Sequence, residues 1–398
     1  MTCSGVRQKH CSLNDGSGNH LSFRLMEHVG PVLPLDQVGQ AHATYACAFF
    51  DEDTDETFLF YTGATPDWSE SHIEVAVSND GIKFKPLSRE EPLVKYGRMT
   101  LTPAVFKVDD TFYMAFAFEG SDRERRIALA RANDILGPYK ILGELARPTA
   151  LWEGHAVDLG PSVARISDRE LLLFYSNTRT MWGFVHRTLE RHTLLKRGRM
   201  NVILSRRRAG LLLDRGQFGA LLGLRRMSFF LGFKLINISL KNRHVRVTPG
   251  RRRIGILRIK VTKAGRCLVS RYERNPLGHL NGEWGSWCES LFCPGYMKIG
   301  HMHVLLPTAA RHSTGLPYDH FIGVYLDETP YFERPVMRSI LINGPEEKAK
   351  ISSHAEGTLL LDTPSPIVKD DMLWLYYALA DTSDLIWTTA LSIFEIQR

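Results

Sequence analysis

The sequence predicts an all-β protein, a five-bladed β-propeller with a basic insertion inside blade 3. Two observations predict this fold. The same order of short strand-like runs recurs five times, and one break in that rhythm coincides with the most basic stretch of the chain. The composition fits a folded protein, because 44% of the 398 residues are hydrophobic and 10% are aromatic.

Each of the five copies begins with a predicted β-hairpin. The second strands of the hairpins are aromatic and aliphatic runs that suit a buried pleated strand, at 58–63, 112–118, 171–177, 303–309 and 373–379. A shorter strand precedes each run across a polar turn, at 45–50, 104–108, 162–167, 296–300 and 366–370. A third strand follows, at 73–80, 126–134, 252–260, 320–328 and 385–392. Radial closure of such units leaves only short protected edges, whereas a β-sandwich does not explain the fivefold order.

The spacing between strands locates the insertion. In four copies the third strand begins soon after the second, at 73 after 58, 126 after 112, 320 after 303 and 385 after 373. In the third copy the second strand begins at 171 and the third not until 252. We therefore expect a propeller over 31–398, interrupted by an insertion at 180–251. Residues 1–30 begin with a polar stretch rich in Ser, Gly and Asn, and we expect them to form a flexible N-terminal tail.

The positive charge of the chain is concentrated in one segment. The net charge is +7, but residues 187–260 hold 20 Lys and Arg against two acids, a charge of +18. Three interpretations of this segment stay open. It forms a subdomain that caps the propeller, it docks as a basic amphipathic surface on anionic lipid, or it binds nucleic acid. The last is disfavoured because no RNA-binding or zinc signature accompanies it, and its arginines would also suit substrate phosphates.

Signal-like segments, apolar runs and cysteines bear on the cellular location of the protein and on its cofactors. The N-terminus lacks the apolar core of a secretory signal, and no run approaches the length of about 20 apolar residues that a spanning helix needs. We expect a cytoplasmic protein, peripheral to a membrane if the basic segment docks there. The six cysteines lack zinc-finger spacing and no metal-binding loop is recognisable, so no cofactor is expected.

Ligands of a propeller bind at the axial end where the first strand of each blade begins. Ionisable side chains in the loops before those strands are therefore candidates for the site. They are Asp36 and His42 in blade 1, Glu153, His155 and Asp158 in blade 3, Glu289 in blade 4, and Asp362 in blade 5. Prolines stand at the strand mouths of blades 2 to 5, at Pro103, Pro161, Pro294 and Pro366.

Other side chains near these loops are candidates for substrate binding. Trp152 and Trp287 could stack on sugar rings, although a tryptophan packed between blades is the commoner outcome. Arg179 and Arg311 follow the second strands of blades 3 and 4 and could reach a hydroxyl, carboxylate or phosphate. His303 lies on a predicted strand, where a structural role competes with a binding role.

The blade rhythm, together with the motifs DLGPSV at 158–163 and NDILGPY at 133–139, resembles the five-bladed propeller glycosidases, namely glycoside hydrolase family 43 and related families. The resemblance covers about 40–180 and 252–395. It implies an Asp base in blade 1, an Asp that orients it in blade 3 and a Glu general acid in blade 4. Asp36, Asp158 and Glu289 are the residues here that stand nearest to those roles.

The chain departs from the family pattern in each of these blades. His42 to Tyr45 stand where the family has Asp-Pro in blade 1. Asp158 lies three residues before Pro161 instead of directly before it, and Glu289 lies five residues before Pro294 instead of two.

The function predicted is that of a glycosidase, which pairs one protonated and one ionised carboxyl across the scissile bond. Asp158 and Glu289 are the expected pair. One alternative is a transferase or phosphorylase that acts on a phosphorylated or lipid-linked sugar. A second alternative is a propeller that binds glycans without catalysis.

Overall fold

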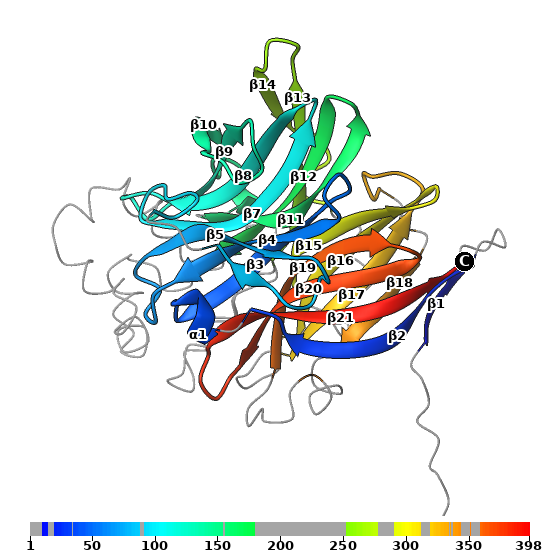
Figure 1. Cartoon of the computed structure of the whole chain (residues 1–398). Helices are drawn as coiled ribbons and strands as arrows, with labels where there is room; N and C mark the ends of the chain where they lie inside the picture. The colour runs from blue at the N-terminus through cyan, green and yellow to red at the C-terminus, as the bar shows by residue number, and fades with distance from the viewer. Residues whose placement is uncertain are drawn as a thin grey trace, which may run out of the picture.

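The structure is a computed structural model. It describes residues 10–14, 20–33, 35–87, 91–153, 156–179, 252–277, 290–311, 319–333, 335, 337–343, 351 and 359–398. These residues form an all-β protein in which the only helices are α1 (Leu35–Val38) and a 3-10 turn (Leu151–Glu153) (Figure 1). No helix among them has the length and apolar character needed to cross a membrane.

Five antiparallel units follow one another along the chain. Unit 1 contains β3 (His42–Asp51), β4 (Glu56–Ala64), β5 (Ser71–Ser78) and β6 (Lys85–Pro86). Unit 2 contains β7 (Met99–Val108), β8 (Thr111–Glu119), β9 (Arg125–Ala132) and β10 (Lys140–Ala146). Unit 3 contains β11 (Ala156–Ser167), β12 (Glu170–Arg179), β13 (Ile254–Val261) and β14 (Cys267–Arg271).

Units 4 and 5 complete the series. Unit 4 contains β15 (Ser290–Ile299), β16 (Met302–Arg311), β17 (Asp319–Asp327) and β18 (Met337–Asn343). Unit 5 contains β19 (Leu359–Lys369), β20 (Met372–Asp381) and β21 (Trp387–Gln397), to which β2 (His20–Pro31) and β1 (His10–Asn14) are added.

The second and third strands of unit 3 pair with each other although they are far apart in the sequence. β12 pairs directly with β13 from Glu170↔Lys260 to Ser176↔Ile254, although β12 ends at Arg179 and β13 begins only at Ile254. Strands so distant in sequence become neighbours because their apolar residues complete the same sheet. The expected insertion at 180–251 lies outside the described residues.

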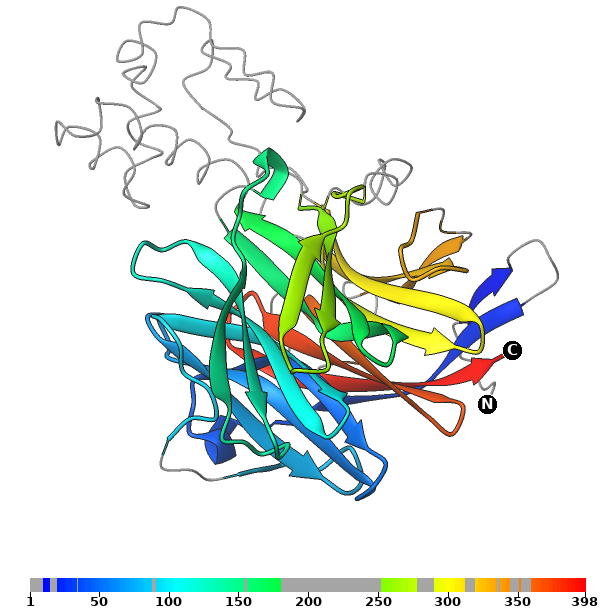
Figure 2. The same cartoon turned by 90° about the horizontal axis from the view of Figure 1, so that it is seen from above.

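The first strands of the units surround a common centre. β3 contacts β7, β7 contacts β11, β11 contacts β15, β15 contacts β19, and β19 contacts β3. Figure 2 shows units 1 and 2, in blue and cyan, on one side of the molecule and the yellow strands of unit 4 on the other. Each pair of consecutive units shares an apolar cluster, and units 5 and 1 share another. The strands are therefore covered on both faces, which explains why their sequences are nearly continuous apolar runs without strict alternation.

The N-terminal part of the chain corrects one expectation. We expected residues 1–30 to form a flexible tail, but β2 pairs along β21 from Ser22↔Gln397 to Pro31↔Ala390. Phe23 of β2 is 1% exposed and lies in the cluster that joins units 4 and 5. The sequence did not predict this strand because polar residues surround its apolar side chains. Those side chains become buried only by packing on unit 5.

The prolines lie inside the first strands, not at their mouths. Each first strand has a β-bulge near its start, and the bulges of β7, β11 and β15 contain Pro103, Pro161 and Pro294. In β19 the bulge contains Pro364, while the predicted mouth residue Pro366 pairs with Leu375 beyond it. Proline fits at a bulge because the extra residue leaves the hydrogen-bonded ladder.

Candidate active site

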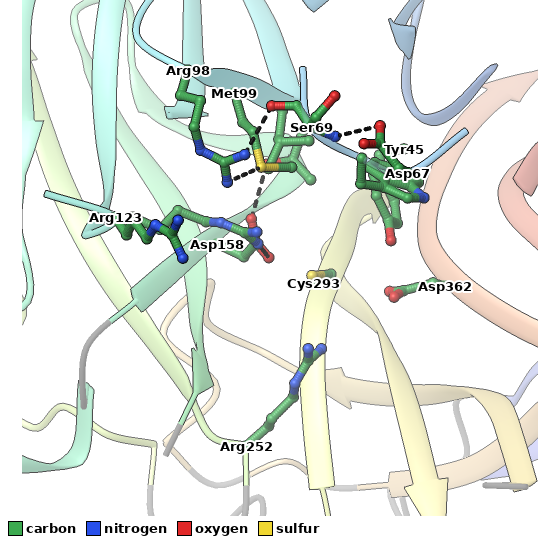
Figure 3. Close-up of a pocket in the computed structure, with 14 residues that line it drawn as sticks. Tyr45, Asp67, Ser69, Arg98, Met99, Arg123, Asp158, Arg252, Cys293 and Asp362 are labelled. Carbon is green, nitrogen blue, oxygen red and sulfur yellow. Dashed lines mark hydrogen bonds and ion pairs between the residues drawn. The ribbon is translucent and has the colours of Figure 1, made fainter. Parts of the chain in front are cut away.

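A cavity of about 540 Å³ opens at the end of the molecule where the first strands begin (Figure 3). Each of the five first strands contributes its third or fourth residue to the lining, namely Tyr45, Thr102, Asp158, Cys293 and Asp362. Loops between strands add further charged and aromatic side chains, namely Asp67, Trp68, Arg98, Arg123 and Arg252, and Arg125 opens β9. The polar residues of all five units therefore meet in one cavity.

The bulges determine how the first strands present side chains to this cavity. Tyr45, Thr102, Cys293 and Thr363 occupy the left-handed region there, with φ between 43° and 52°. Such backbone is strained for residues other than glycine, and it persists where the surroundings over-determine it. A bulge also turns side chains away from the regular alternation of a strand, so it brings polar groups toward the centre.

The neighbouring unit supplies the hydrogen bonds that these bulges lose. The backbone N–H of Thr102 donates to Thr62 Oγ1 at 3.1 Å, and that of Thr363 donates to Thr308 Oγ1 at 3.0 Å. The N–H of Cys293 donates to Ser176 Oγ at 3.2 Å. Buried N–H groups require such partners, so hydroxyl residues on the second strands hold the floor of the cavity in place.

Asp158 lies in the cavity, as the sequence predicted. Its Oδ2 is 2.7 Å from Arg125 Nη1, and Thr102 Oγ1 donates to its Oδ1 at 3.4 Å. Arg125 is itself mostly buried, and although burial opposes its charge, the Asp158 carboxylate raises the pKa of the guanidinium. The ion pair with Arg125 fixes the position of the Asp158 side chain at the cavity.

Asp362 lies in the same cavity and differs from Asp158 in its surroundings. It is 7% exposed, and burial raises its pKa to about 6, against the opposing charge of Arg252 and hydrogen bonds from Thr363, and with added repulsion from Asp158. The hydrogen bonds that it accepts from described residues, namely from the Thr363 N–H, Thr363 Oγ1 and Thr308 Oγ1, all fall on Oδ1. Oδ2 is therefore the oxygen on which a proton would face the cavity.

Tyr45 of β3 also lines the cavity. Burial and the charges of Asp362 and Asp158 raise the pKa of its phenol well above the ordinary value, so the group is neutral and can donate a hydrogen bond. The predicted binding residue His42 lies beside it and stacks on Trp68 with ring centroids 4.7 Å apart. Its Nδ1 accepts the Trp387 backbone N–H at 3.1 Å, so His42 contacts both Trp68 and Trp387.

The aromatic wall of the cavity was not predicted from the sequence. Trp68 lines the cavity beside Tyr45, with ring centroids 5.8 Å apart, and Trp387 packs on Tyr45 at the same centroid distance. Flat apolar faces of this kind suit sugar rings. Trp152, which we expected to stack on a sugar, is 8% exposed and packs on Tyr175 within the core between units 2 and 3.

Other predicted site residues lie away from the cavity. Asp36 is exposed on α1 and does not line the cavity. Glu153 is fully buried in a separate network, with Oε1 2.8 Å from Arg271 Nε and 2.7 Å from the Tyr175 hydroxyl. His303 lies near the opposite end of unit 4, where its Nδ1 is 2.7 Å from the Tyr296 hydroxyl.

Several predicted residues cannot be placed. His155, Trp287 and Glu289 lie outside the described residues. Arg179 and Arg311 end β12 and β16, but their side chains also lie outside the described part. Glu289 as the acid therefore stays a prediction.

The sequence did not predict the arginines of the cavity, because only the loops before first strands were considered. Third strands begin at the same end of a unit as first strands, because the second strand runs back between them. Arg125 opens β9, and Arg252 stands two residues before β13. Charged residues in the loops before third strands are the signal that would have found both. Within the described residues, no group of three or more His, Cys, Asp or Glu is placed to hold a metal ion.

Comparison with known proteins identifies the fold. No family model and no curated protein sequence matches the chain. Solved structures match it at low sequence identity. A thermostable family-43 glycoside hydrolase is 12% identical, with 89% of this chain and 93% of that chain covered and a TM-score of 0.50. A second glycoside hydrolase is 12% identical over 93% and 92% of the two chains, with a TM-score of 0.54.

A third structure, an RGII complex, is 11% identical over 93% and 92% of the two chains, with a TM-score of 0.56. The protein therefore has the propeller-like fold of glycoside hydrolases. At this level of identity the shared property is the fold, and the chemistry has to be argued from the cavity.

Proposed function

We propose that the five units are the blades of a propeller and that the protein is a carbohydrate-active enzyme which cleaves a glycosidic bond in the central cavity. One observation carries the proposal. Two buried carboxyls from different units face the same cavity in different surroundings: Arg125 Nη1 lies 2.7 Å from Asp158 Oδ2, whereas burial raises the pKa of Asp362 to about 6. A protonated carboxyl opposite an ionised one is typical of glycoside cleavage.

The surroundings of the two carboxyls assign a catalytic role to each. Asp362, with its pKa raised to about 6, is the proton donor to the leaving-group oxygen through Oδ2. Asp158, paired with Arg125, accepts the proton of the attacking group or stabilises the positive charge that develops on the sugar ring. Tyr45 donates a hydrogen bond, and the wall formed with Trp68 holds a sugar ring.

The test is turnover of an oligosaccharide panel, followed by chromatography of the products. Asp362→Asn and Asp158→Asn should each lower kcat by about 10²–10⁴, the usual contribution of a positioned acid or base. Asp53→Asn, in the exposed turn between β3 and β4, is the matched control and should retain activity. For wild type, kcat/KM should fall as the pH rises through about 6, because Asp362 then loses its proton.

Two results would contradict the proposal. Full turnover by both variants would remove the pair from the mechanism. Saturable binding of a sugar with no turnover of any substrate would support the glycan-binding alternative.

We also propose that the enzyme is cytoplasmic and that residues 187–260 dock it on an anionic membrane surface. The support is the charge of +18 in this segment. Residues 252–260 lie within the described chain, and they include the start of unit 3's third strand.

A further inference from the structure

The arginines that line the cavity fall into two groups by their partners. Arg98 Nη2 lies 2.6 Å from Glu119 Oε1, and Arg125 Nη1 lies 2.7 Å from Asp158 Oδ2. In the part of the chain that the structure describes, Arg123 and Arg252 have no carboxylate within 4.0 Å. The cavity therefore contains cationic groups that the described carboxylates do not pair.

Arg252 is the better placed of the two unpaired arginines. Its guanidinium carbon lies 4.0 Å from the centroid of the Phe292 ring, and its backbone N–H donates to Ser290 Oγ at 3.2 Å. Figure 3 shows the side chain pointing into the cavity toward Cys293 and Asp362. Stacking on a ring occupies the face of a guanidinium and leaves its N–H donors free in the plane.

Arg123 is the second cationic group at the cavity that has no carboxylate partner among the described residues. A guanidinium fork matches the oxygens of phosphate in a bidentate manner, and more than one unpaired cationic donor suits an anion of more than one charge.

We propose that Arg252 binds a phosphate-type oxyanion in the cavity, so that the carbohydrate reaction involves a phosphoryl group. The inference rests on the proposed function, in which this cavity holds a sugar. The oxyanion is either inorganic phosphate as a co-substrate or a phosphoryl group on the sugar itself.

The protonation state of Asp362 makes anion binding at Arg252 depend on pH. When its carboxyl is ionised it competes with an incoming anion for Arg252, and when it is protonated the charge of Arg252 is uncompensated. The other groups around Asp362 are Asp158, paired with Arg125, and Tyr45 and Cys293, whose raised pKa values keep them neutral. On β17, His320 Nδ1 lies 2.9 Å from the carbonyl oxygen of Leu361 and is the further group that could titrate.

The experiment measures sulfate binding to the full chain by calorimetry at low ionic strength. Sulfate is a tetrahedral dianion whose charge is constant between pH 5 and 8, so a change in affinity reports on the protein. We expect saturable binding at pH 5 that weakens as much as about 100-fold by pH 8, with uptake of about one proton near neutrality. Buffers of different ionisation enthalpy count that proton.

Three variants locate the site. Arg252→Gln should weaken sulfate binding at least about tenfold at pH 5, the loss of a charged hydrogen-bond partner. Arg169→Gln, which removes an arginine in the distant turn between β11 and β12, should leave it unchanged. Asp362→Asn should bind sulfate with little dependence on pH. Wild-type affinity in Arg252→Gln, or no saturable binding by the wild-type chain, would overturn the proposal. A pH dependence that survives in Asp362→Asn would assign the linkage to His320 instead.

Product analysis separates the two sources of the oxyanion. In phosphorolysis the glycosidic C–O bond breaks, a phosphate oxygen forms a bond to the anomeric carbon, and Asp362 gives its proton to the leaving oxygen. A neutral oligosaccharide with inorganic phosphate would then yield a sugar phosphate, whereas a phosphorylated oligosaccharide would be cleaved without added phosphate. Sulfate binding without any turnover would leave the anion site standing and remove the enzymatic proposal, and turnover without sulfate binding would do the reverse.

Discussion

Among single residues, the two carboxyls of the cavity show how one residue type is placed in two different surroundings. Asp158 has a guanidinium at 2.7 Å, whereas Asp362 has three hydrogen bonds on one oxygen and a cation farther away. Burial of a carboxyl favours its neutral form unless a charge or hydrogen bonds compensate. The state of each acid therefore depends on partners from other units.

The raised pKa of Asp362 predicts a cost in stability at neutral pH. The folded pKa of about 6 lies above the ordinary value of 3.8, so folding favours the protonated form. The stability from this group is complete below pH 3.8 and is lost as the pH rises through 6, a loss of about 3 kcal/mol. Asp362→Asn should therefore be more stable than wild type at pH 7.5, by up to about 3 kcal/mol, in urea denaturation.

The predicted gain in stability of Asp362→Asn distinguishes this effect from the loss of stability that most substitutions cause. The advantage of Asp362→Asn should shrink as the pH falls toward 4.5, where wild type is also uncharged at this position. An Asp362→Asn chain less stable than wild type at pH 7.5 would contradict the burial argument.

Glu153 shows why an acid in a promising loop can be structural. It is fully buried, yet hydrogen bonds from Arg271, Tyr175 and the N–H groups of Thr149 and Ala150 outweigh burial and lower its pKa. Glu153 and Asp158 belong to the same loop in sequence. Only Asp158 reaches the cavity, because β11 begins between them and carries Asp158 toward the centre.

At the scale of elements, the bulged first strands are the feature that makes the cavity. Near the centre these strands approach so closely that the position after the bulge proline is small, namely Ala104, Ser162, Gly295 and Ser365, and Cys47 at the matching position in β3. A Cβ on Gly295 would lie 2.2 Å from the Pro364 carbonyl oxygen. The spacing of units thus depends on small residues at the centre.

Gly295→Ala should destabilise the protein by about 3 kcal/mol or more, because the added methyl group meets backbone of the next unit. The measurement is the midpoint and slope of urea unfolding. Gly63→Ala is the matched control, since its nearest new contact is the Gln40 side chain at 3.1 Å, which can move. Equal stability of the two variants would show that neighbouring first strands are not in close contact.

At the scale of the whole molecule, the chain ends close the structure. β2 pairs with β21, and β1 pairs with β2, so the first described strands complete the last unit beside the C-terminus (Figure 1). The side chains take part as well, because Ser22 Oγ donates to Gln397 Oε1 at 3.2 Å. This pairing joins segments from the two ends of the sequence in one sheet, on the side of β21 away from the first strand β19.

Phe23→Ala should lower the free energy of unfolding by about 3–5 kcal/mol, as expected for a fully buried aromatic side chain. Met26→Ala in the same strand is the control, because Met26 is 50% exposed, and it should change stability by less than about 0.5 kcal/mol. Thermal unfolding checks both. An unchanged melting temperature for Phe23→Ala would mean that β2 does not close unit 5.

The proposal of membrane docking can be tested by deleting most of the basic segment. Because the Asn177 N–H donates to the Arg253 carbonyl oxygen at 3.3 Å, the ends of unit 3's interrupted hairpin are adjacent. Deletion of residues 185–250 leaves a short connection and should preserve the melting temperature. Wild type, but not the deletion variant, should sediment with phosphatidylserine vesicles at low salt. No sedimentation of wild type would remove the proposal.

Strand order, the fivefold repeat and the interrupted third unit followed from the sequence by itself. Apolar runs and turn residues are local signals, and strands buried on both faces make those signals strong. The sequence also indicated that Asp158 and Asp362 lie near the starts of first strands, and both line the cavity there, while their function stays a proposal.

Only the tertiary structure decided which acids share the cavity. It joined β2 to unit 5, buried Glu153 away from the cavity, raised the pKa of Asp362 and brought Arg252 and Arg125 beside the carboxyls. These outcomes depend on distances between units and on the charge and hydration at the centre. Such quantities arise between residues far apart in the chain, so no local pattern of amino acids encodes them.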